Sequence, residues 1–313
     1  MTSTPIPELA ARSKVASRAM ANASTAVKNE ALLAAADLLE VRSGELLTAN
    51  AQDVSSAEAN GIAPGLIDRL RLSPERVTAM ADGLRQVATL ADPVGEVMSG
   101  WVRPNGLRIT QVRVPLGVVA IIYESRPNVT SDAAGLCLKS GNAAFLRGSG
   151  SAINSNLAIG EVLREAVTKA GLPTDAVIVV DDVSREAATE FMRQRGFIDV
   201  LIPRGGHSLI QSILDNATVP FVIDGDGNCH IYVDESADLD MARSIVLNAK
   251  TQRPSVCNAR SRLWSTQPSP RTCCPNSPEP CPRSSWWAMR GPDPWCPAWV
   301  RPASRTTPRS SST

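Results

Sequence analysis

The fold is decided by residues 114–149, VPLGVVAIIYESRPNVTSDAAGLCLKSGNAAFLRGS, in which two apolar runs enclose a helical segment. The unbroken apolar run at 117–123 is typical of a strand that is buried on both faces of a sheet. Residues 132–140 have the pattern of a helix, and residues 142–147 have that of a second strand. This strand–helix–strand order indicates an α/β fold with a parallel sheet.

The same alternation continues beyond this stretch. Further strands are predicted at 176–180, 198–203, 219–223 and 230–233, and helices at 153–170, 184–195, 207–216 and 239–250. Strands and helices at this spacing predict a doubly wound, mostly parallel sheet. Upstream, residues 6–50 and a segment that starts at Ser73 and Pro74 have helical spacing. We therefore expect a group of N-terminal helices that packs on the sheet.

Residues 100–114 have a different period from the helices before them. Asn105-Gly106 is the strongest short signal for a hairpin, and alternating residues flank it. The polar residues of the second arm suit a ribbon that reaches into solvent. Such a projecting hairpin is either a surface arm or an edge that pairs with another subunit. The residue pattern alone does not distinguish a surface arm from a subunit contact.

Composition limits the class of protein. The N-terminal residues contain no apolar signal region, and no run of about 18 apolar residues exists, so neither secretion nor a membrane span is expected. Three cysteines precede residue 260, namely Cys137, Cys229 and Cys257, and they lie far apart. This usage is typical of reduced thiols, so we expect a cytoplasmic protein.

The last 54 residues differ from the rest of the chain. Residues 1–259 hold 24 Lys and Arg against 29 Asp and Glu, whereas residues 260–313 hold eight Arg, no Lys and two acidic residues. Five of the six Trp and 11 of the 23 Pro also lie there, but only Leu263 and Val300 represent Leu, Ile and Val. Because this segment has no periodic apolar face to bury, we expect a disordered tail.

The bias of the tail has three interpretations. An abrupt excess of Arg, Pro, Ser, Trp and Cys is what a GC-rich coding sequence gives when it is read out of frame, so we interpret the change near Arg260 as a frameshift, in the gene or in sequencing. A zinc or disulfide tail on Cys273, Cys274, Cys281 and Cys296 is disfavoured, because these cysteines do not form two CxxC pairs and no His accompanies them. Nucleic-acid binding by the Arg-rich tail is supported only by the net positive charge of the tail. We expect no metal site.

Small and polar residues follow three of the predicted strands. They lie at Glu124–Asn128 (ESRPN), Arg147–Ser151 (RGSGS) and Pro203–His207 (PRGGH). The last two place an Arg beside glycines just before a helix, which suits a phosphate group. Neither GxGxxG nor GxxxxGK[ST] is present. One such turn is equally compatible with a plain left-handed turn and a solvated Arg, but two in one sheet favour a phosphate-bearing ligand.

Cys257 lies in residues 248–259, NAKTQRPSVCNA, after the last predicted helix and close in sequence to Lys250 and Arg253. A cysteine there is either an inert small hydrophobe or a nucleophilic thiolate. The second role needs partial exposure and an electropositive setting that lowers the pKa of the thiol.

Four stretches resemble one known family. They are residues 114–149, 202–210 (IPRGGHSLI), 224–240 (DGDGNCHIYVDESADLD) and 248–259. These stretches are similar to the γ-glutamyl phosphate reductases, the glutamate-5-semialdehyde dehydrogenases of proline biosynthesis, within the aldehyde dehydrogenase superfamily. The resemblance runs from near the N-terminus to Ala259, and no motif of the family follows it.

The resemblance implies an aldehyde dehydrogenase-like fold with a truncated catalytic domain. Residues 1–240 would form the NADP-binding domain with its N-terminal helices, and the hairpin at 100–114 would be the oligomerisation arm. Residues 241–259 would begin the catalytic domain, and residues 260–313 would be a non-homologous tail.

The resemblance also implies a reaction. NADPH would reduce L-glutamyl 5-phosphate to L-glutamate 5-semialdehyde and phosphate, the second step of proline biosynthesis from glutamate. Cys257 matches the catalytic cysteine, whose thiolate would attack the acyl phosphate and form a thioacyl enzyme. Asn128 matches the substrate or oxyanion contact after a small shift, and Asp224 loosely matches the general base. The alternative is an inactive truncated fragment that at most binds nucleotide.

Cofactor and partners follow from the same resemblance. Arg147 falls where the superfamily places a cation on the adenosine ribose and its 2′-phosphate, and Ser149 lies in the same turn. Gly205 and Gly206 fall in the turn that faces the cofactor. The implied partners are L-glutamyl 5-phosphate, further copies in a homo-oligomer, and a functional link to glutamate 5-kinase. Neither nucleic acid nor membrane is implied.

Overall fold

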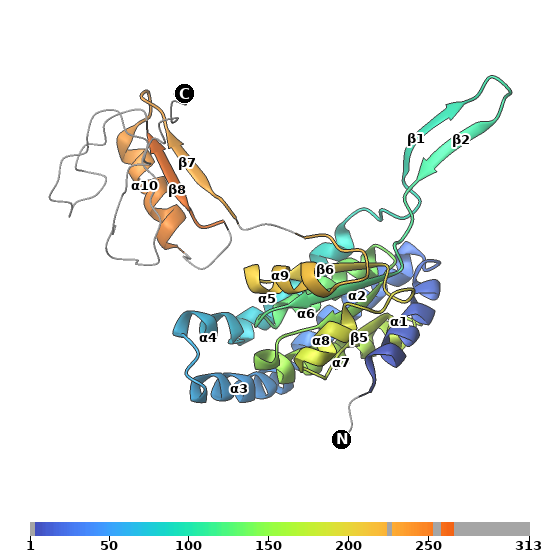
Figure 1. Cartoon of the computed structure of the whole chain (residues 1–313), viewed down its shortest axis with the longest axis horizontal. Helices are drawn as coiled ribbons and strands as arrows, with labels where there is room; N and C mark the ends of the chain where they lie inside the picture. The colour runs from blue at the N-terminus through green and yellow to red at the C-terminus, as the bar shows by residue number, and fades with distance from the viewer. Residues whose placement is uncertain (1–3, 224–226, 253–257, 266–313) are drawn as a thin grey trace, which may run out of the picture. The chain divides into compact units, whose positions relative to one another are not determined.

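The computed structural model describes residues 4–223, 227–252 and 258–265. The chain divides into two compact units, Met1–Asp224 and Gly225–Thr313. The first unit holds the predicted α/β sheet, and Figure 1 shows its helices packed around the strands.

The central sheet of the first unit has four parallel strands. These are β3 (Val118–Tyr123), β4 (Ala143–Arg147), β5 (Val177–Val179) and β6 (Val200–Arg204), in the order β5-β4-β3-β6. All six residues of β3 are buried, as its unbroken apolar run predicted. In the register of the sheet, Ile121 pairs with Leu146 on one side and with Ile202 on the other. The carboxyl ends of β4, β3 and β6 therefore lie side by side.

Helices cover both faces of this sheet, which confirms the doubly wound fold. One face packs against α6 (Asn128–Lys139) and α7 (Ile153–Lys169), and α2 (Thr25–Val41) and α5 (Pro74–Thr89) pack on these two helices. The other packs against α1 (Ile6–Met20), α8 (Arg185–Phe191) and α9 (His207–Asn216). Successive strand residues alternate between the two cores, as the pleat requires. Phe145 of β4 stacks on Phe191 of α8 with a centroid distance of 4.6 Å.

Local signals explain where these helices begin. Ser24, Ser73 and Ser184 accept hydrogen bonds from the first-turn N–H groups of α2, α5 and α8. Helices α3 (Ser43–Ala59) and α4 (Pro64–Leu70) add a small cluster around Val54 and Leu70. The N-terminal residues are thus helical, as their spacing predicted, but they divide between the two faces, with α1 on the side of α8 and with α2 and α5 on the side of α6 and α7.

The predicted strand at 219–223 is wrong. Only one bridge forms there, between Leu201 of β6 and Phe221. Leu201 donates to the Pro220 carbonyl at 2.8 Å, and Val222 donates to the Leu201 carbonyl at 3.0 Å. The next β6 residue on that side is Pro203, which has no N–H to extend the ladder.

The predicted hairpin is confirmed. Strands β1 (Val97–Val102) and β2 (Arg108–Val112) are antiparallel, with Trp101 opposite Ile109. Gly106 has a φ of +85° and donates to the Arg103 carbonyl at 2.9 Å, so a glycine is suited to the turn. Figure 1 shows the ribbon projecting from the helical body. Its exposed apolar side chains are Val97, Met98, Trp101, Val102, Leu107 and Val112.

The second unit is one strand–helix–strand motif. It consists of β7 (His230–Val233), α10 (Leu239–Thr251) and β8 (Arg262–Ser265), and the two strands are parallel. His230 and Trp264 pack edge to face with centroids 5.8 Å apart. Because β7 pairs with β8 and not with the large sheet, the units divide at Asp224, whereas the sequence placed the end of the first domain at 240.

Strand β8 lies inside the segment that the sequence assigned to a disordered tail, so the expectation of disorder fails at residues 262–265. The pairing uses backbone groups, and Leu263 and Trp264 supply apolar side chains for it. The remainder of the predicted tail, residues 266–313, lies outside the described residues.

Two general properties concern the described part of the chain only. None of its helices combines the length and the apolar character that crossing a bilayer requires. No three of its His, Cys, Asp and Glu side chains gather in a way that could hold a metal ion.

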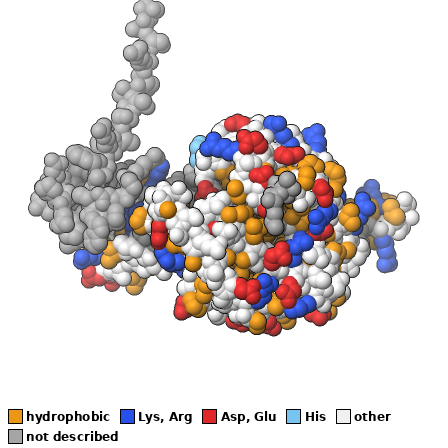
Figure 2. Space-filling view, turned by 90° about the horizontal axis from the view of Figure 1, so that it is seen from below, with side chains coloured by type: hydrophobic (Ala, Val, Ile, Leu, Met, Phe, Trp, Pro, Cys, Tyr) orange, Lys and Arg blue, Asp and Glu red, His pale blue; other side chains and the backbone are white. Residues whose placement is uncertain are grey.

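On the face of the first unit seen in Figure 2, Lys and Arg side chains are interspersed with Asp and Glu side chains.

Candidate functional site

The predicted cofactor residues lie on two turns that flank β3. Arg147 ends β4 and Ser149 follows it, while Gly205 and Gly206 follow β6. Because β4 and β6 are the two neighbours of β3, both turns reach the same carboxyl edge of the sheet. This edge is where doubly wound sheets bind ligands. The structure thus brings together the two Arg–Gly turns that the sequence singled out.

Arg147 is held against the loop between β5 and α8. Its Nη2 donates to the carbonyls of Val183 and Ser184, both at 2.9 Å. Burial lowers the pKa of Arg147, and the nearby Asp182 carboxylate partly offsets that effect. The Nε atom is buried and has no hydrogen-bond partner among the described residues. The guanidinium is therefore fixed in position, and its buried Nε–H is left without a partner among the described residues.

Three serine hydroxyls connect the ends of β3 and β4. Ser125 Oγ lies 2.5 Å from Ser151 Oγ, and Ser149 Oγ lies 2.7 Å from Ser151 Oγ. Ser149 Oγ also accepts from the Ser151 N–H at 3.2 Å. Each hydroxyl can both donate and accept, so the group can rearrange around a polar ligand. The sequence identified Ser149 but missed Ser125 and Ser151 as its partners, although both belong to the quoted polar turns.

Behind the β4 turn lies a buried polar chain. Tyr123 Oη and Thr130 Oγ1 are 2.7 Å apart, and Thr130 Oγ1 donates to Asn156 Oδ1 at 3.0 Å. The Nδ2 of Asn156 is buried without a partner among the described residues. A Cβ added to Gly148 would lie 2.0 Å from that Nδ2. These hydrogen-bonded side chains pack against the β4 turn, and they leave no room for a side chain at position 148.

The carboxylate of Glu124 lies against the turn that follows β6. Glu124 directly follows β3, and its Oε1 accepts a hydrogen bond from the Gly206 N–H at 2.7 Å. A Cβ at Gly205 would lie 2.9 Å from Glu124 Cγ and Oε1. Sequence reasoning placed Glu124 in a polar strand end but did not connect it with Gly206. That contact depends on β3 and β6 being neighbours.

Asn128, the predicted substrate contact, is the first residue of α6 and is exposed. Its Nδ2 donates to Asp132 Oδ2, one turn later in the same helix, at 2.9 Å. Helix α6 follows β3, so Asn128 lies near the same edge of the sheet. One N–H of its amide is thus used within its own helix, and its role remains a prediction.

The predicted nucleophile Cys257 and the loosely matched base Asp224 lie outside the described residues. Cys137 is buried, which raises the pKa of its thiol to about 12. A thiol in that state is an inert one. Cys137 is therefore excluded as the reactive cysteine.

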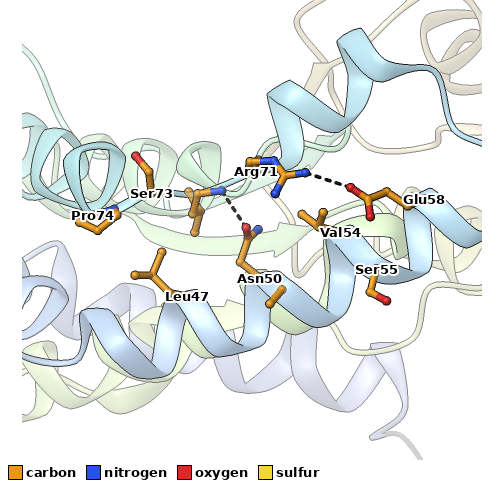
Figure 3. A pocket seen from close by; sticks show the side chains of 10 residues that line it. Leu47, Asn50, Val54, Ser55, Glu58, Arg71, Ser73 and Pro74 are labelled. Carbon is orange, nitrogen blue, oxygen red and sulfur yellow. Dashed lines mark hydrogen bonds and ion pairs between the residues drawn. The ribbon is translucent and has the colours of Figure 1, made fainter.

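A groove of about 510 Å³ lies elsewhere in the first unit, between α3 and the segment before α5. Figure 3 shows the Arg71–Glu58 ion pair, 2.9 Å long, and the Leu72 N–H that donates to Asn50 Oδ1 at 2.7 Å. The groove contains none of the predicted site residues. Because its charged side chains pair with each other, it offers less to a polar ligand than the sheet edge does.

Comparison with known families gives one match over most of the chain. Residues 1–268 match the aldehyde dehydrogenase family. This match extends nine residues past Ala259, where the resemblance recognised in the sequence ends. The matched range includes β8.

Individual relatives have a more specific name. The chain is 54% identical over 258 residues to a protein of Thermobifida fusca called gamma-glutamyl phosphate reductase, which covers 82% of this chain and 62% of the relative. It is 55% identical over 250 residues to the protein of that name from Clostridium beijerinckii, covering 80% of this chain and 60% of the relative. The chain thus spans about three fifths of the length of these relatives.

Solved structures of the same name have the same fold. The gamma-glutamyl phosphate reductase of Thermotoga maritima superposes with a TM-score of 0.78 at 45% identity, over 84% of this chain and 63% of that one. The Saccharomyces cerevisiae structure gives a TM-score of 0.66 at 30% identity, over 85% and 66%. These superpositions confirm the predicted fold class.

Proposed function

This chain belongs to the aldehyde dehydrogenase family, and we propose that it takes part in the reaction for which its relatives are named. In this reaction NADPH reduces L-glutamyl 5-phosphate to L-glutamate 5-semialdehyde and phosphate, as the second step of proline biosynthesis from glutamate. The observation that carries the proposal is 54% identity over 258 residues to a relative called gamma-glutamyl phosphate reductase. The reductases work on a metabolite, so we expect a cytoplasmic protein.

The residues at the sheet edge fit a dinucleotide cofactor that carries an extra phosphate. The orphaned Nε of Arg147 and its anchored guanidinium suit the 2′-phosphate of NADPH. Ser149 offers a hydroxyl beside it, and the backbone N–H groups of Gly205 and Gly206 suit phosphate oxygens at the start of α9. When bound, NADPH supplies the hydride.

Cys257 would act as the nucleophile. Its thiolate attacks the acyl carbon, a C–S bond forms, and the C–O bond to phosphate breaks as phosphate leaves with the electron pair. The resulting thioester accepts hydride more readily than a carboxylate does. Collapse of the hemithioacetal on Cys257 then returns the thiolate and releases the aldehyde. Asn128 would donate to the oxyanion through the second N–H of its amide nitrogen, since one N–H is directed to Asp132.

The exposed apolar hairpin supports a homo-oligomer, with β1 and β2 as the contact. A functional link to glutamate 5-kinase is part of the same proposal, because an acyl phosphate hydrolyses readily and must be made close to where it is used.

The test is the reverse reaction in purified full-length protein, measured as phosphate-dependent formation of NADPH from NADP⁺ and glutamate 5-semialdehyde. We expect turnover that Cys257→Ser abolishes and that Cys137→Ser leaves at the wild-type rate, because Cys137 is buried and inert. Nucleotide binding without any turnover would instead support the second candidate, an inactive fragment that binds nucleotide. The chain spans about three fifths of the length of the relative from Thermobifida fusca.

A further inference from the structure

Glu124 is fixed beside the glycine turn by the sheet itself. It follows the last residue of β3, and its own N–H donates to the Arg204 carbonyl at 3.2 Å. This hydrogen bond extends the β3–β6 ladder by one residue beyond Tyr123. The side chain of Glu124 is therefore held next to Gly205 and Gly206 by backbone pairing.

The carboxylate of Glu124 covers the turn closely. Its Oε1 lies 2.7 Å from the Gly206 nitrogen, and a Cβ at Gly205 would approach both Cγ and Oε1 to 2.9 Å. The absence of a side chain at Gly205 thus makes room for two groups of this chain, the Glu124 carboxylate and the side chain of Leu209, whose Cδ2 would lie 2.8 Å from that Cβ.

Gly206 is the N-cap of α9, and it has no side chain with which to cap the helix. The first N–H groups of a helix point outward and favour negative charge. Here the Gly206 N–H is satisfied by the Glu124 carboxylate. A phosphate oxygen that binds the same N–H must displace the carboxylate, since two anions next to one donor repel each other.

We propose that Glu124 is an internal competitor for the phosphate position of the Gly205–Gly206 turn, and that it sets the affinity of the cofactor. This inference rests on the proposed function. In the free chain Glu124 holds the turn and caps α9. On cofactor binding its side chain turns into solvent, which is open to it because Glu124 is an exposed residue. The carboxylate therefore weakens cofactor binding while it supports the unliganded turn.

The test compares dissociation constants for NADPH, measured by fluorescence titration, in wild-type full chain and in Glu124→Gln and Glu124→Ala. Gln keeps the length and the acceptor atom but removes the charge, and Ala removes both. We expect NADPH to bind about three- to tenfold more tightly to Glu124→Ala, the range that a charge at a helix terminus commonly contributes. Glu124→Gln should fall between the Ala variant and the wild type.

Glu186→Gln is the matched control. Glu186 lies in the first turn of the neighbouring helix α8, where Ser184 and not Glu186 provides the cap. This variant removes the same charge without freeing a backbone N–H, so its NADPH affinity should stay within about twofold of the wild type. Circular dichroism verifies that each variant is folded.

Four results decide the inference. Tighter binding in both Glu124 variants with no change in Glu186→Gln supports it. Weaker binding in Glu124→Ala overturns it and makes Glu124 a direct contact of the cofactor, and equal affinity overturns it as well. If neither wild type nor variants bind NADPH, the proposed function fails together with this inference, whereas equal tight binding rejects the inference alone.

Discussion

Asn156 Nδ2 fills the space in which a side chain at Gly148 would lie, because a Cβ on that glycine would come within 2.0 Å of the nitrogen. The Asn156 side chain is fully buried, and its Oδ1 accepts from Thr130 at 3.0 Å. The amide cannot swing away without breaking this bond. The turn between Arg147 and Ser149 therefore needs a glycine, because Asn156 of α7 fills the space beside it.

Gly148→Ala should destabilise the protein and weaken NADPH binding together. The new methyl must displace either Asn156 or the turn, and overpacking of this kind costs about 1–3 kcal/mol. Urea unfolding and NADPH titration measure the two effects. Gly44→Ala is the control, because nothing lies within 4 Å of its Cβ. In the double variant Gly148→Ala with Asn156→Ala, part of the loss should be recovered; strictly additive losses would contradict the contact.

A buried ion pair joins α2 to the segment that precedes the hairpin. Lys28 Nζ lies 2.6 Å from Asp92 Oδ2, and the Lys28 side chain is only 1% exposed. Lys28→Met should cost about 3 kcal/mol of unfolding free energy, because it leaves the Asp92 carboxylate without its cation. Lys14→Met is the matched control. The Lys14–Asp199 pair is equally short but about 30% exposed, so its loss should cost about 1 kcal/mol or less.

The same pair predicts how stability changes with pH. Burial of Asp92 raises the pKa of its carboxyl, but hydrogen bonds from Lys28, Thr25 and the Val94 N–H outweigh burial and hold the pKa below its usual range. A carboxyl whose pKa is lower in the folded state stabilises the fold above its unfolded pKa, about 3.9, and loses this contribution as pH falls through the folded value. The difference between wild type and Lys28→Met should therefore shrink below about pH 4. A difference that stays constant from pH 7 to pH 3 in urea titrations would argue against this assignment.

The sequence predicts those features that depend on neighbouring residues. The apolar run of β3 and the Asn105-Gly106 turn were found where their local patterns placed them. The helix after β3 was also found, but it begins at Asn128, four residues before the predicted start. The predicted strand at 219–223 failed because the residue that limits its pairing, Pro203, lies on another strand. A local pattern cannot show which strand will be the partner.

The site has the same division between local and non-local features. The turns at Arg147 and Gly205 were predictable, because each is an Arg–Gly step just before a helix. The contact of Glu124 with Gly206 was not, since it requires β6 to pair with β3 on the side opposite to β4. The position of Asn156 beneath Gly148 likewise depends on how α7 packs on the sheet. Strand order and helix packing arise from the whole core and not from any single motif.

The projecting hairpin should mediate self-association. Trp101 is 48% exposed and Val102 is 64% exposed on a ribbon of two strands. Trp101→Glu should shift the protein from oligomer toward monomer in light scattering coupled to size exclusion, with its unfolding free energy within about 0.5 kcal/mol of the wild type. Arg108→Glu, a charge change on the other strand of the ribbon, should shift it less. A monomeric wild-type chain would contradict the role of the hairpin.

Thiol labelling should separate the cysteines by environment. Burial raises the pKa of Cys137 to about 12, so almost none of it is thiolate at neutral pH, and it is also shielded from reagents. If Cys257 is the nucleophile, its thiolate is present at neutral pH and iodoacetamide should modify it much faster than Cys137 in the native protein. Mass spectrometry of digested peptides assigns each site over a time course. Urea should remove the difference, because unfolding returns both thiols to the ordinary pKa of about 8.5. Equal labelling rates in the native protein would contradict both the buried state of Cys137 and the activated state of Cys257.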